Sequence, residues 1–258
     1  MKLTFEEHGT GKPIVLLHAF PLSRKMWQPQ IKALITKNCR VILPDLRGFG
    51  ESHNFSDINS MEDMAKDVAE LLEALKIERA IIGGLSMGGY VLFELFKLFP
   101  EKFAALILCD TSFAADSDDK RKARFDLIEK IEKSGAQILI EAMLPDLTSN
   151  NTKTNNQVLM IELEKSFAEV NAKAAVAALR GMAQRKDNSN VLDSVSLPTI
   201  LIFGKEDKII NLSVAEKMHQ KILNSNLVLI EDAGHYSNLE QPEQFNTALT
   251  QFIGTVNS

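Results

Sequence analysis

The sequence has only two cysteines and no long uninterrupted apolar run, and each shortage argues against a class of protein. Cys39 and Cys109 lie far apart and without metal-type spacing, which argues against a disulfide framework and against a zinc site. The longest uncharged apolar stretch covers residues 80–93 and contains several glycines. Because a helix needs roughly 20 apolar residues to cross a bilayer, we expect no membrane span and interpret this stretch as protein core.

An excess of positive charge is also lacking. The chain has 29 Lys and Arg against 34 Asp and Glu, a net charge of −5, and no basic block, so nucleic acid is not an expected partner. Residues 1–10 carry charges and lack the apolar core of a secretory signal, which predicts a cytoplasmic chain. With 258 residues and 45% hydrophobic content, the chain is long enough for one large domain with an insertion.

Short apolar runs recur along the chain, with amphipathic segments between them. Several runs are unbroken rather than alternating, which is typical of strands covered on both faces. The clearest helix spans residues 60–75, where Ser60 and Asp63 form a weaker version of a capping box. This alternation predicts an α/β fold with a doubly wound, mostly parallel sheet. The expected strands are 2–6, 14–18, 40–44, 80–85, 104–110, 199–203 and 226–231, and the other expected helices are 27–36, 88–98, 213–223 and 242–253.

Residues 113–195 depart from this alternation, because they show helical periodicity and almost no strand signal. They predict an all-helical insertion into a core domain made of residues 1–112 and 196–258. Most apolar residues of the insertion are expected to pack it against itself, while the remainder line a substrate pocket. The residues we expect in that pocket are Phe125, Met143 and Leu144, with Trp27 from the core, although core packing explains Trp27 equally well.

The stretch "IIGGLSMGGY" at residues 81–90 gathers glycines around one serine, Ser86. It matches neither of the glycine patterns that bind nucleotide phosphates. It does match Gly-x-Ser-x-Gly, from Gly84 to Gly88, between an expected strand and an expected helix. A serine on such a sharp turn is held in a strained backbone conformation, and strand and helix pass so closely that side chains at the two glycines find little room. Ser86 is therefore the candidate nucleophile.

A serine nucleophile needs a base, and the base needs a carboxylate that orients it. Asp207, in "GKEDK", and His235, in "AGHYS", each follow an expected strand, as Ser86 does. Catalytic groups of open α/β sheets collect at the carboxyl ends of the strands, so the three side chains are expected to meet there. Asp110 also follows a strand and is the rival for the acid, with a hydrogen bond inside its own loop as the alternative role.

Motifs spread over nearly the whole chain resemble those of the α/β-hydrolase family, in the branch that includes carboxylesterases and enol-lactonases. The resemblance implies that residues 113–195 form a cap, inserted after the sixth strand of the family's sheet. It also implies an oxyanion hole made by the backbone N–H groups of Phe20 and Met87. One departure is Ala19 after His18, where the family usually has glycine. The motifs are "LLHAFPL" at 16–22, "DLRGFGES" at 45–52, "GLSMGG" at 84–89, "GKEDK" at 204–208 and "AGHYSNLEQPE" at 233–243.

These residues predict a serine hydrolase that needs neither cofactor nor metal and acts on small-molecule esters. Ser86 attacks the acyl carbon, His235 transfers the proton, and Asp207 orients the imidazole. The apolar cap suggests a small apolar acyl group. A lactonase, a carbon–carbon bond hydrolase or a perhydrolase with the same triad are alternatives within the enzyme class. A small-ligand receptor that turns over too slowly to act as an enzyme is the alternative of another class.

Overall fold

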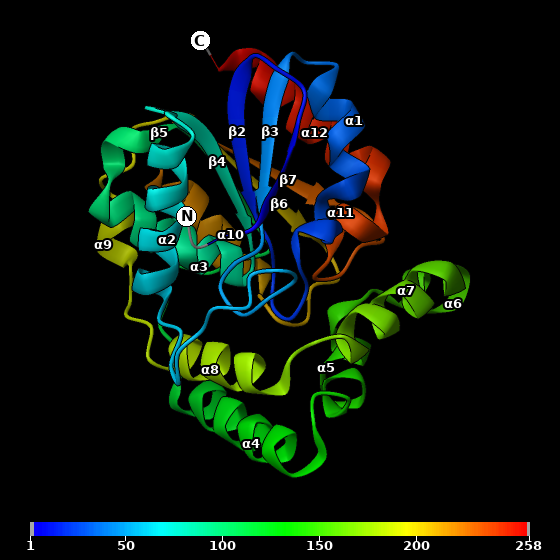
Figure 1. The fold of residues 1–258 in the computed structure, drawn as a ribbon. Helices are drawn as coiled ribbons and strands as arrows, with labels where there is room; N and C mark the ends of the chain where they lie inside the picture. Colours follow the sequence, from blue (N-terminus) through cyan, green and yellow to red (C-terminus); the bar gives the residue numbers. More distant parts are fainter. Residues whose placement is uncertain (1–2, 257–258) are drawn as a thin grey trace.

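The computed structural model describes residues 3–256 and is organised around one seven-stranded sheet (Figure 1). The strand order is β1-β3-β2-β4-β5-β6-β7. β1 runs antiparallel to β3, and every other neighbouring pair is parallel. The predicted α/β class with a mostly parallel sheet is thus confirmed. The strands are β1 (Phe5–His8), β2 (Lys12–Leu17), β3 (Cys39–Pro44), β4 (Ala80–Leu85), β5 (Phe103–Cys109), β6 (Thr199–Gly204) and β7 (Ser225–Ile230).

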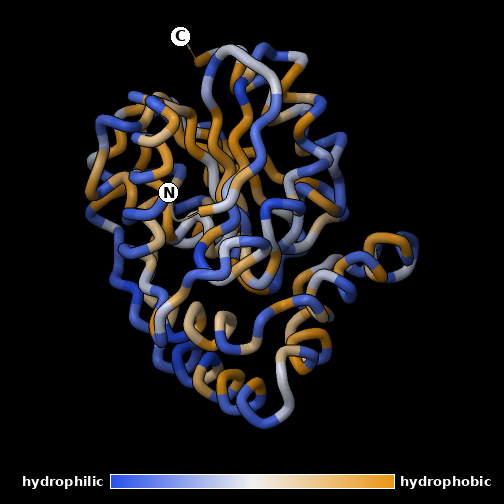
Figure 2. Tube along the Cα trace, in the orientation of Figure 1, coloured by the Kyte–Doolittle hydropathy of each residue, from blue (hydrophilic) through white to orange (hydrophobic). Residues whose placement is uncertain are grey.

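The central strands are buried along most of their length because both faces of the sheet are covered. All six residues of β4 and of β6 are buried. The edge strands β1 and β7 are only partly buried. Figure 2 shows this as a hydrophobic centre inside a more polar shell. Unbroken apolar runs therefore marked the strands correctly.

The first strand differs from its prediction. It lies at Phe5–His8 rather than at residues 2–6, and Lys2 lies outside the described residues. Its register is set by β3, since His8 pairs with Val41 and Phe5 with Pro44. As an edge strand, β1 carries polar residues that made its bounds hard to recognise in the sequence.

Helices cover the two faces of the sheet (Figure 1). On one face α1 packs against α12, and on the other α2 packs against α3. The predicted cap of α2 is confirmed, because the Ser60 hydroxyl accepts the N–H of Asp63 at 3.0 Å. The core helices are η1 (Arg24–Trp27), α1 (Gln28–Ile35), α2 (Met61–Ala74), α3 (Met87–Leu98), η2 (Pro100–Lys102), α10 (Leu212–Lys221), α11 (Ser237–Glu240) and α12 (Pro242–Thr255).

Between β5 and β6 every regular element of the described chain is a helix, as the periodicity of this segment predicts. α4 packs along α8, and α7 contacts both α5 and α6. In Figure 1 the helices α4–α8 lie beyond one end of the sheet. The helices of this insertion are α4 (Asp118–Ser134), α5 (Ile138–Leu147), α6 (Asn150–Asn155), α7 (Gln157–Ala168), α8 (Ala172–Ala183) and α9 (Ser189–Leu192).

A buried ion-pair cluster joins the two ends of the insertion. Asp116 pairs with Arg124 at 2.6 Å and with Arg185 at 2.7 Å, and its side chain has no exposed surface. The Arg185 guanidinium also lies 4.1 Å from the centre of the Tyr90 ring of α3. Burial by itself raises the pKa of Asp116, but the hydrogen bonds and charges of the two arginines outweigh it and hold that pKa below its ordinary value.

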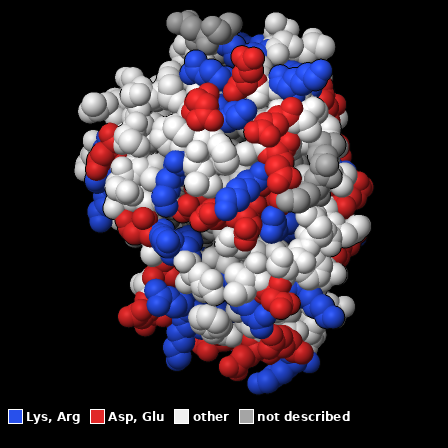
Figure 3. Space-filling view, turned by 60° about the vertical axis from the view of Figure 1, so that its left-hand side comes forward, with Lys and Arg blue, Asp and Glu red and all other residues white. Residues whose placement is uncertain are grey.

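The surface carries charges of both signs. Figure 3 shows Lys and Arg side chains interspersed with Asp and Glu over the visible face, without a broad field of one sign. Within residues 3–256, none of the helices combines the length and the apolar character that crossing a membrane requires.

Replacing Asp116 with Asn removes the charge that holds Arg124 and Arg185 together. At pH 7 we expect the free energy of unfolding to fall by about 3 kcal/mol, the order found when one partner of a buried pair is lost. The pKa of Asp116 is lower in the folded protein than its ordinary value of 3.8. Its contribution to the unfolding free energy is therefore complete at pH values above 3.8 and is lost as the pH falls through the folded-state pKa. Urea unfolding over this pH range should show the difference between wild type and variant shrink in acid.

The matched control is Asp118→Asn. The Asp118 side chain is fully exposed and lies 3.9 Å from Arg121, so we expect its replacement to leave the unfolding free energy close to that of wild type. Equal unfolding free energies for the two variants at pH 7 would contradict the role given to Asp116.

Candidate active site

Ser86 occupies the sharp turn between β4 and α3, in a backbone conformation that few non-glycine residues adopt. Its φ is 53° and its ψ is −112°, which confirms the predicted strain. The turn is fastened to β5, because the Ser86 N–H donates to the Cys109 carbonyl and the Thr111 hydroxyl donates to the Ser86 carbonyl. The side chain is 8% exposed. The backbone strain of the turn is thus located at Ser86, the candidate nucleophile.

Close approach explains the glycines on either side of Ser86. A Cβ added at Gly84 would lie 2.3 Å from the backbone of Gly88, and one added at Gly88 would lie 2.2 Å from the Leu17 carbonyl oxygen. Real Cβ atoms do not come so close to backbone, so any side chain there would push β4, α3 and β2 apart. The spacing of the motif is therefore a packing requirement as well as a chemical one.

The structure brings Ser86, His235 and Asp207 together in one chain of hydrogen bonds. The Ser86 Oγ lies 2.8 Å from His235 Nε2, and His235 Nδ1 lies 2.8 Å from Asp207 Oδ2. A carboxylate only accepts, so Nδ1 carries the proton and Nε2 is left to accept from the serine hydroxyl. The His235 side chain is 2% exposed and that of Asp207 has no exposed surface. In this arrangement His235 can take a proton from Ser86.

The Asp207 carboxylate is itself held from the opposite side. Its Oδ1 accepts the N–H groups of Ile209 at 2.7 Å and Ile210 at 3.0 Å, in the turn that follows β6. These two bonds leave Oδ2 to face His235, which fixes the ring by a geometry that does not depend on substrate.

Asp110, the rival acid, makes no hydrogen bond to His235 among the described residues. Its Oδ1 accepts the Gly204 N–H at 2.8 Å and its Oδ2 accepts the Ser237 hydroxyl, so the expectation of a bond within its own loop was wrong. Burial raises the pKa of Asp110 well above its ordinary value, and the nearby Asp207 charge raises it further. Asp110 therefore ties the turn before Asp207 to the loop after His235.

Neither of the two backbone N–H groups expected to form the oxyanion hole has an acceptor in the described part of the chain. They belong to Phe20, in the loop after β2, and Met87, the first residue of α3. The loop needs no glycine after His18, since Ala19 is not among the residues with positive φ. His18 orders this region, because its Nε2 accepts the Leu46 N–H at 2.9 Å and its Nδ1 therefore donates to the Ala19 carbonyl. Burial lowers the pKa of His18, in keeping with a neutral ring.

Tyr236 connects the histidine loop to the loop of Phe20, a contact that the sequence reasoning missed. The buried Tyr236 hydroxyl donates to the Phe20 carbonyl at 3.1 Å. Its position next to His235 in "AGHYSNLEQPE" was the available signal. The base and the candidate oxyanion donor are thus held to each other as well as to the sheet.

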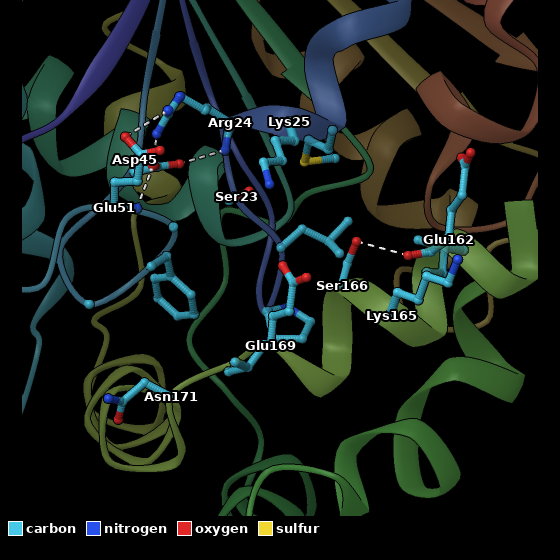
Figure 4. Close-up of a pocket in the computed structure, with 18 of the residues that line it drawn as sticks. Ser23, Arg24, Lys25, Asp45, Glu51, Glu162, Lys165, Ser166, Glu169 and Asn171 are labelled. Carbon is cyan, nitrogen blue, oxygen red and sulfur yellow. Dashed lines mark hydrogen bonds and ion pairs between the residues drawn. The ribbon is translucent and has the colours of Figure 1, made fainter.

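A cavity of about 730 Å³ lies between the core and the insertion. Pro21 and Leu22, which follow Phe20, border it on the core side, and Leu163 of α7 borders it on the other. Figure 4 shows Arg24 directed toward Asp45 and Glu51, and Glu162, Lys165 and Ser166 on α7. The cavity therefore begins beside the loop of Phe20 and combines apolar walls with a charged rim.

None of the four residues expected in the pocket borders this cavity. Trp27 is completely buried and packs against Phe245 with 6.2 Å between ring centres, so core packing is the correct reading for it. Phe125 on α4 is 45% exposed to solvent, Leu144 is buried in the hydrophobic core, and Met143 packs partly buried against that core. Helical periodicity identified apolar faces but not which of them turns toward the site.

The described residues contain no group of three or more His, Cys, Asp or Glu side chains placed to hold a metal ion. The chemistry that the geometry provides is that of a buried hydroxyl, a base and two free amide donors.

Comparisons with known proteins bear on the family and the fold. A family model described as alpha/beta hydrolase fold matches residues 12–242. The 3-oxoadipate enol-lactonase 1 of Acinetobacter baylyi is 30% identical over 243 residues, covering 94% of this chain and 89% of that protein. A solved thermophilic esterase from Thermogutta terrifontis, with malate bound, is similar with a TM-score of 0.96 at 37% identity, covering 99% of this chain and 94% of that chain. The enol-lactonase from Burkholderia xenovorans LB400 gives a TM-score of 0.90 at 25% identity, with 98% and 96% covered.

Replacing Gly88 with Ala tests the close approach at the turn. The added Cβ would meet the Leu17 carbonyl, which cannot move without disturbing β2, so we expect unfolding free energy to fall by about 1–3 kcal/mol. The control is Gly254→Ala in α12, where nothing lies within 4 Å and alanine should be neutral or stabilise by up to about 1 kcal/mol. Thermal and urea unfolding measure both. A Gly88→Ala variant as stable as wild type would show that the turn tolerates a side chain.

Proposed function

Because the chain belongs to the α/β-hydrolase family, we propose that it is a serine hydrolase that cleaves carboxylic esters of small, mostly apolar acyl groups. The single observation that carries this proposal is the buried chain of hydrogen bonds from Ser86 through His235 to Asp207. The similar esterase and enol-lactonases support the coarser class of hydrolase.

In the proposed mechanism, Ser86 Oγ attacks the ester carbonyl carbon while its proton moves to His235 Nε2. The negative charge that develops on the carbonyl oxygen is accepted by the N–H groups of Phe20 and Met87, which donate to nothing else in the described chain. As the carbon–oxygen bond of the ester breaks, His235 gives the proton to the leaving alkoxide. Water then attacks the acyl-enzyme, again with His235 as base, and releases the acid.

Asp207 stabilises the imidazolium that forms in each half-reaction without taking the proton itself. Its two backbone hydrogen bonds, from Ile209 and Ile210, hold it in place through the cycle. Asp110 is left out of the proton path, because its oxygens are already engaged by Gly204 and Ser237.

Access to the nucleophile favours a small acyl group. Ser86 is only 8% exposed, and residues 113–195, which we propose act as a cap, lie over this end of the sheet. The N–H of His235 donates to the Leu147 carbonyl of that segment, so the cap closes directly on the site. A bulky acyl chain would need the cap to move before it reached Ser86.

Lactone hydrolysis is the second candidate, since a lactone is a cyclic ester and needs the same attack and the same oxyanion donors. The observation that favours it is the 30% identity to an enol-lactonase over 94% of this chain. For a lactone the leaving alkoxide stays attached to the acyl-enzyme, so a compact cyclic substrate suits a covered site.

Ser86→Ala tests the covalent mechanism. Without the hydroxyl no acyl-enzyme forms, so we expect kcat for short p-nitrophenyl esters and simple lactones to fall by roughly 10⁴-fold or more. Circular dichroism and thermal unfolding should show an intact fold. Turnover retained in this variant would refute nucleophilic attack by Ser86, and absence of turnover by the wild type on the whole panel would favour the receptor alternative.

Comparing Asp207→Asn with Asp110→Asn tests which carboxyl is the acid. Asn at 207 no longer fixes the Nδ1–H tautomer, so we expect kcat to fall by about 10⁴-fold, the order seen for this change in a serine protease. Asn at 110 can still accept the Gly204 N–H and donate to the Ser237 hydroxyl, so we expect kcat of Asp110→Asn to fall by no more than about tenfold. Steady-state kinetics on one ester decide. A large loss confined to Asp110→Asn would overturn the assignment.

A further inference from the structure

Glu240, in the short helix α11, holds the loop that carries His235. Its carboxylate is 5% exposed, and its Oε1 accepts the N–H of Gly234 at 2.9 Å and that of Tyr236 at 3.3 Å. These two residues stand on either side of His235 in the chain. One oxygen of Glu240 thus binds the backbone on both sides of His235 and so helps to orient the imidazole.

The other oxygen of the same carboxylate is bound to the helical insertion. Glu240 Oε2 accepts the Ser149 N–H at 2.7 Å and the Thr152 hydroxyl at 2.8 Å. Both donors sit at the start of α6, and both are almost fully buried, at 1% and 2% exposed. Four donors converge on one carboxylate, two from the histidine loop and two from the insertion.

Direct hydrogen bonds also join the histidine loop to the insertion. The N–H of His235 donates to the Leu147 carbonyl at 3.0 Å, and the Ser149 hydroxyl donates to the Asp232 carbonyl at 3.0 Å. A Cβ added at Gly234 would lie 2.8 Å from the Ser149 nitrogen, so no solvent layer separates the segments. The three consecutive N–H groups at positions 234–236 therefore all end on Glu240 or on the insertion.

We propose that Glu240 is a positioning residue that holds His235 at hydrogen-bond distance from Ser86, and that it draws half of its own support from Ser149 and Thr152 of the insertion. The insertion then does more than cover the substrate, because the start of α6 is part of the apparatus that places the base. This proposal rests on the proposed function of Ser86 and His235. A general base displaced by about 1 Å loses roughly 100-fold in rate, so small movements of this loop matter.

Thr152→Val is the sharpest probe, because it removes one hydroxyl at nearly constant shape and leaves the charge of the site unaltered. The Ser149 hydroxyl still caps the N–H of residue 152 in this variant. The matched control is Thr154→Val, in the same helix, whose exposed hydroxyl donates only to the Asn150 carbonyl at 3.0 Å. Glu240→Gln is the stronger second variant. It replaces one accepting oxygen with an NH₂ group, which then faces N–H or O–H groups that need an acceptor.

Three readouts apply to the full chain: kcat and KM for p-nitrophenyl acetate, the rate at which a small fluorophosphonate modifies Ser86, and amide hydrogen exchange of a peptide covering residues 233–240. For Thr152→Val we expect kcat and the labelling rate to fall about tenfold together, the order for losing one hydrogen bond to a charged group, with KM unchanged. Exchange at residues 234–236 should quicken. Glu240→Gln should lower kcat by roughly 100-fold, and Thr154→Val should behave as wild type.

The proposal is overturned if Thr152→Val matches Thr154→Val in labelling rate and in exchange, or if Thr152→Val raises KM and leaves kcat unaltered. Should Glu240→Gln fail to fold, Thr152→Val decides alone. A wild type that hydrolyses no ester would count against the proposed function only, because labelling and exchange still report whether the insertion holds the histidine loop.

Discussion

The near-contact of β4, α3 and β2 at Gly84 and Gly88 is the constraint on which the rest of the site depends. With no side chain at either glycine, the backbone can turn so sharply that Ser86 adopts a φ of 53°. The same turn starts α3 at Met87, whose N–H has no helical partner at the first position of the helix. The close approach of Gly88 to the Leu17 and His18 carbonyls packs the start of α3 against the chain that leads into the loop of Phe20. The strained turn of Ser86 and the unbonded N–H of Met87 are thus consequences of one packing arrangement.

Three buried carboxyls bind His235 or the residues near it in the chain, and their different hydrogen-bond partners give them different roles. Asp207 accepts two backbone N–H groups and faces the ring, which suits a group that orients the imidazole. Asp110 has a raised pKa and joins the turn of Asp207 to the loop of His235. Glu240 accepts four donors and joins that loop to the insertion. Environment, rather than residue type, separates these roles.

Local patterns made the sheet and the turn of Ser86 predictable, because unbroken apolar runs and closely spaced glycines are visible within a few residues. The polar edge strand β1 was misplaced, since its register depends on pairing with β3. Contacts between distant segments were the harder part. Asp110 bonds to Gly204 and Ser237, which are distant in the sequence, and the spacing of these residues does not predict the contact. Trp27 failed as a pocket residue for the same reason, because periodicity says that a side chain is buried and not against which neighbour.

The insertion meets the core in two chemically different ways, and this difference bears on how substrate choice can vary within one fold. At its α5–α6 turn it is bound to the histidine loop by a dense set of buried hydrogen bonds. The residues of α7 that border the cavity, such as Leu163 and Ser166, bond to no residue of that loop in the described chain. A change on α7 therefore alters the shape or charge of the cavity while the base stays in place. On the proposed role of Glu240, a change at Ser149 or Thr152 would instead disturb the placement of His235. The wall of the cavity and the contact with the histidine loop thus lie at separate parts of the same helical segment.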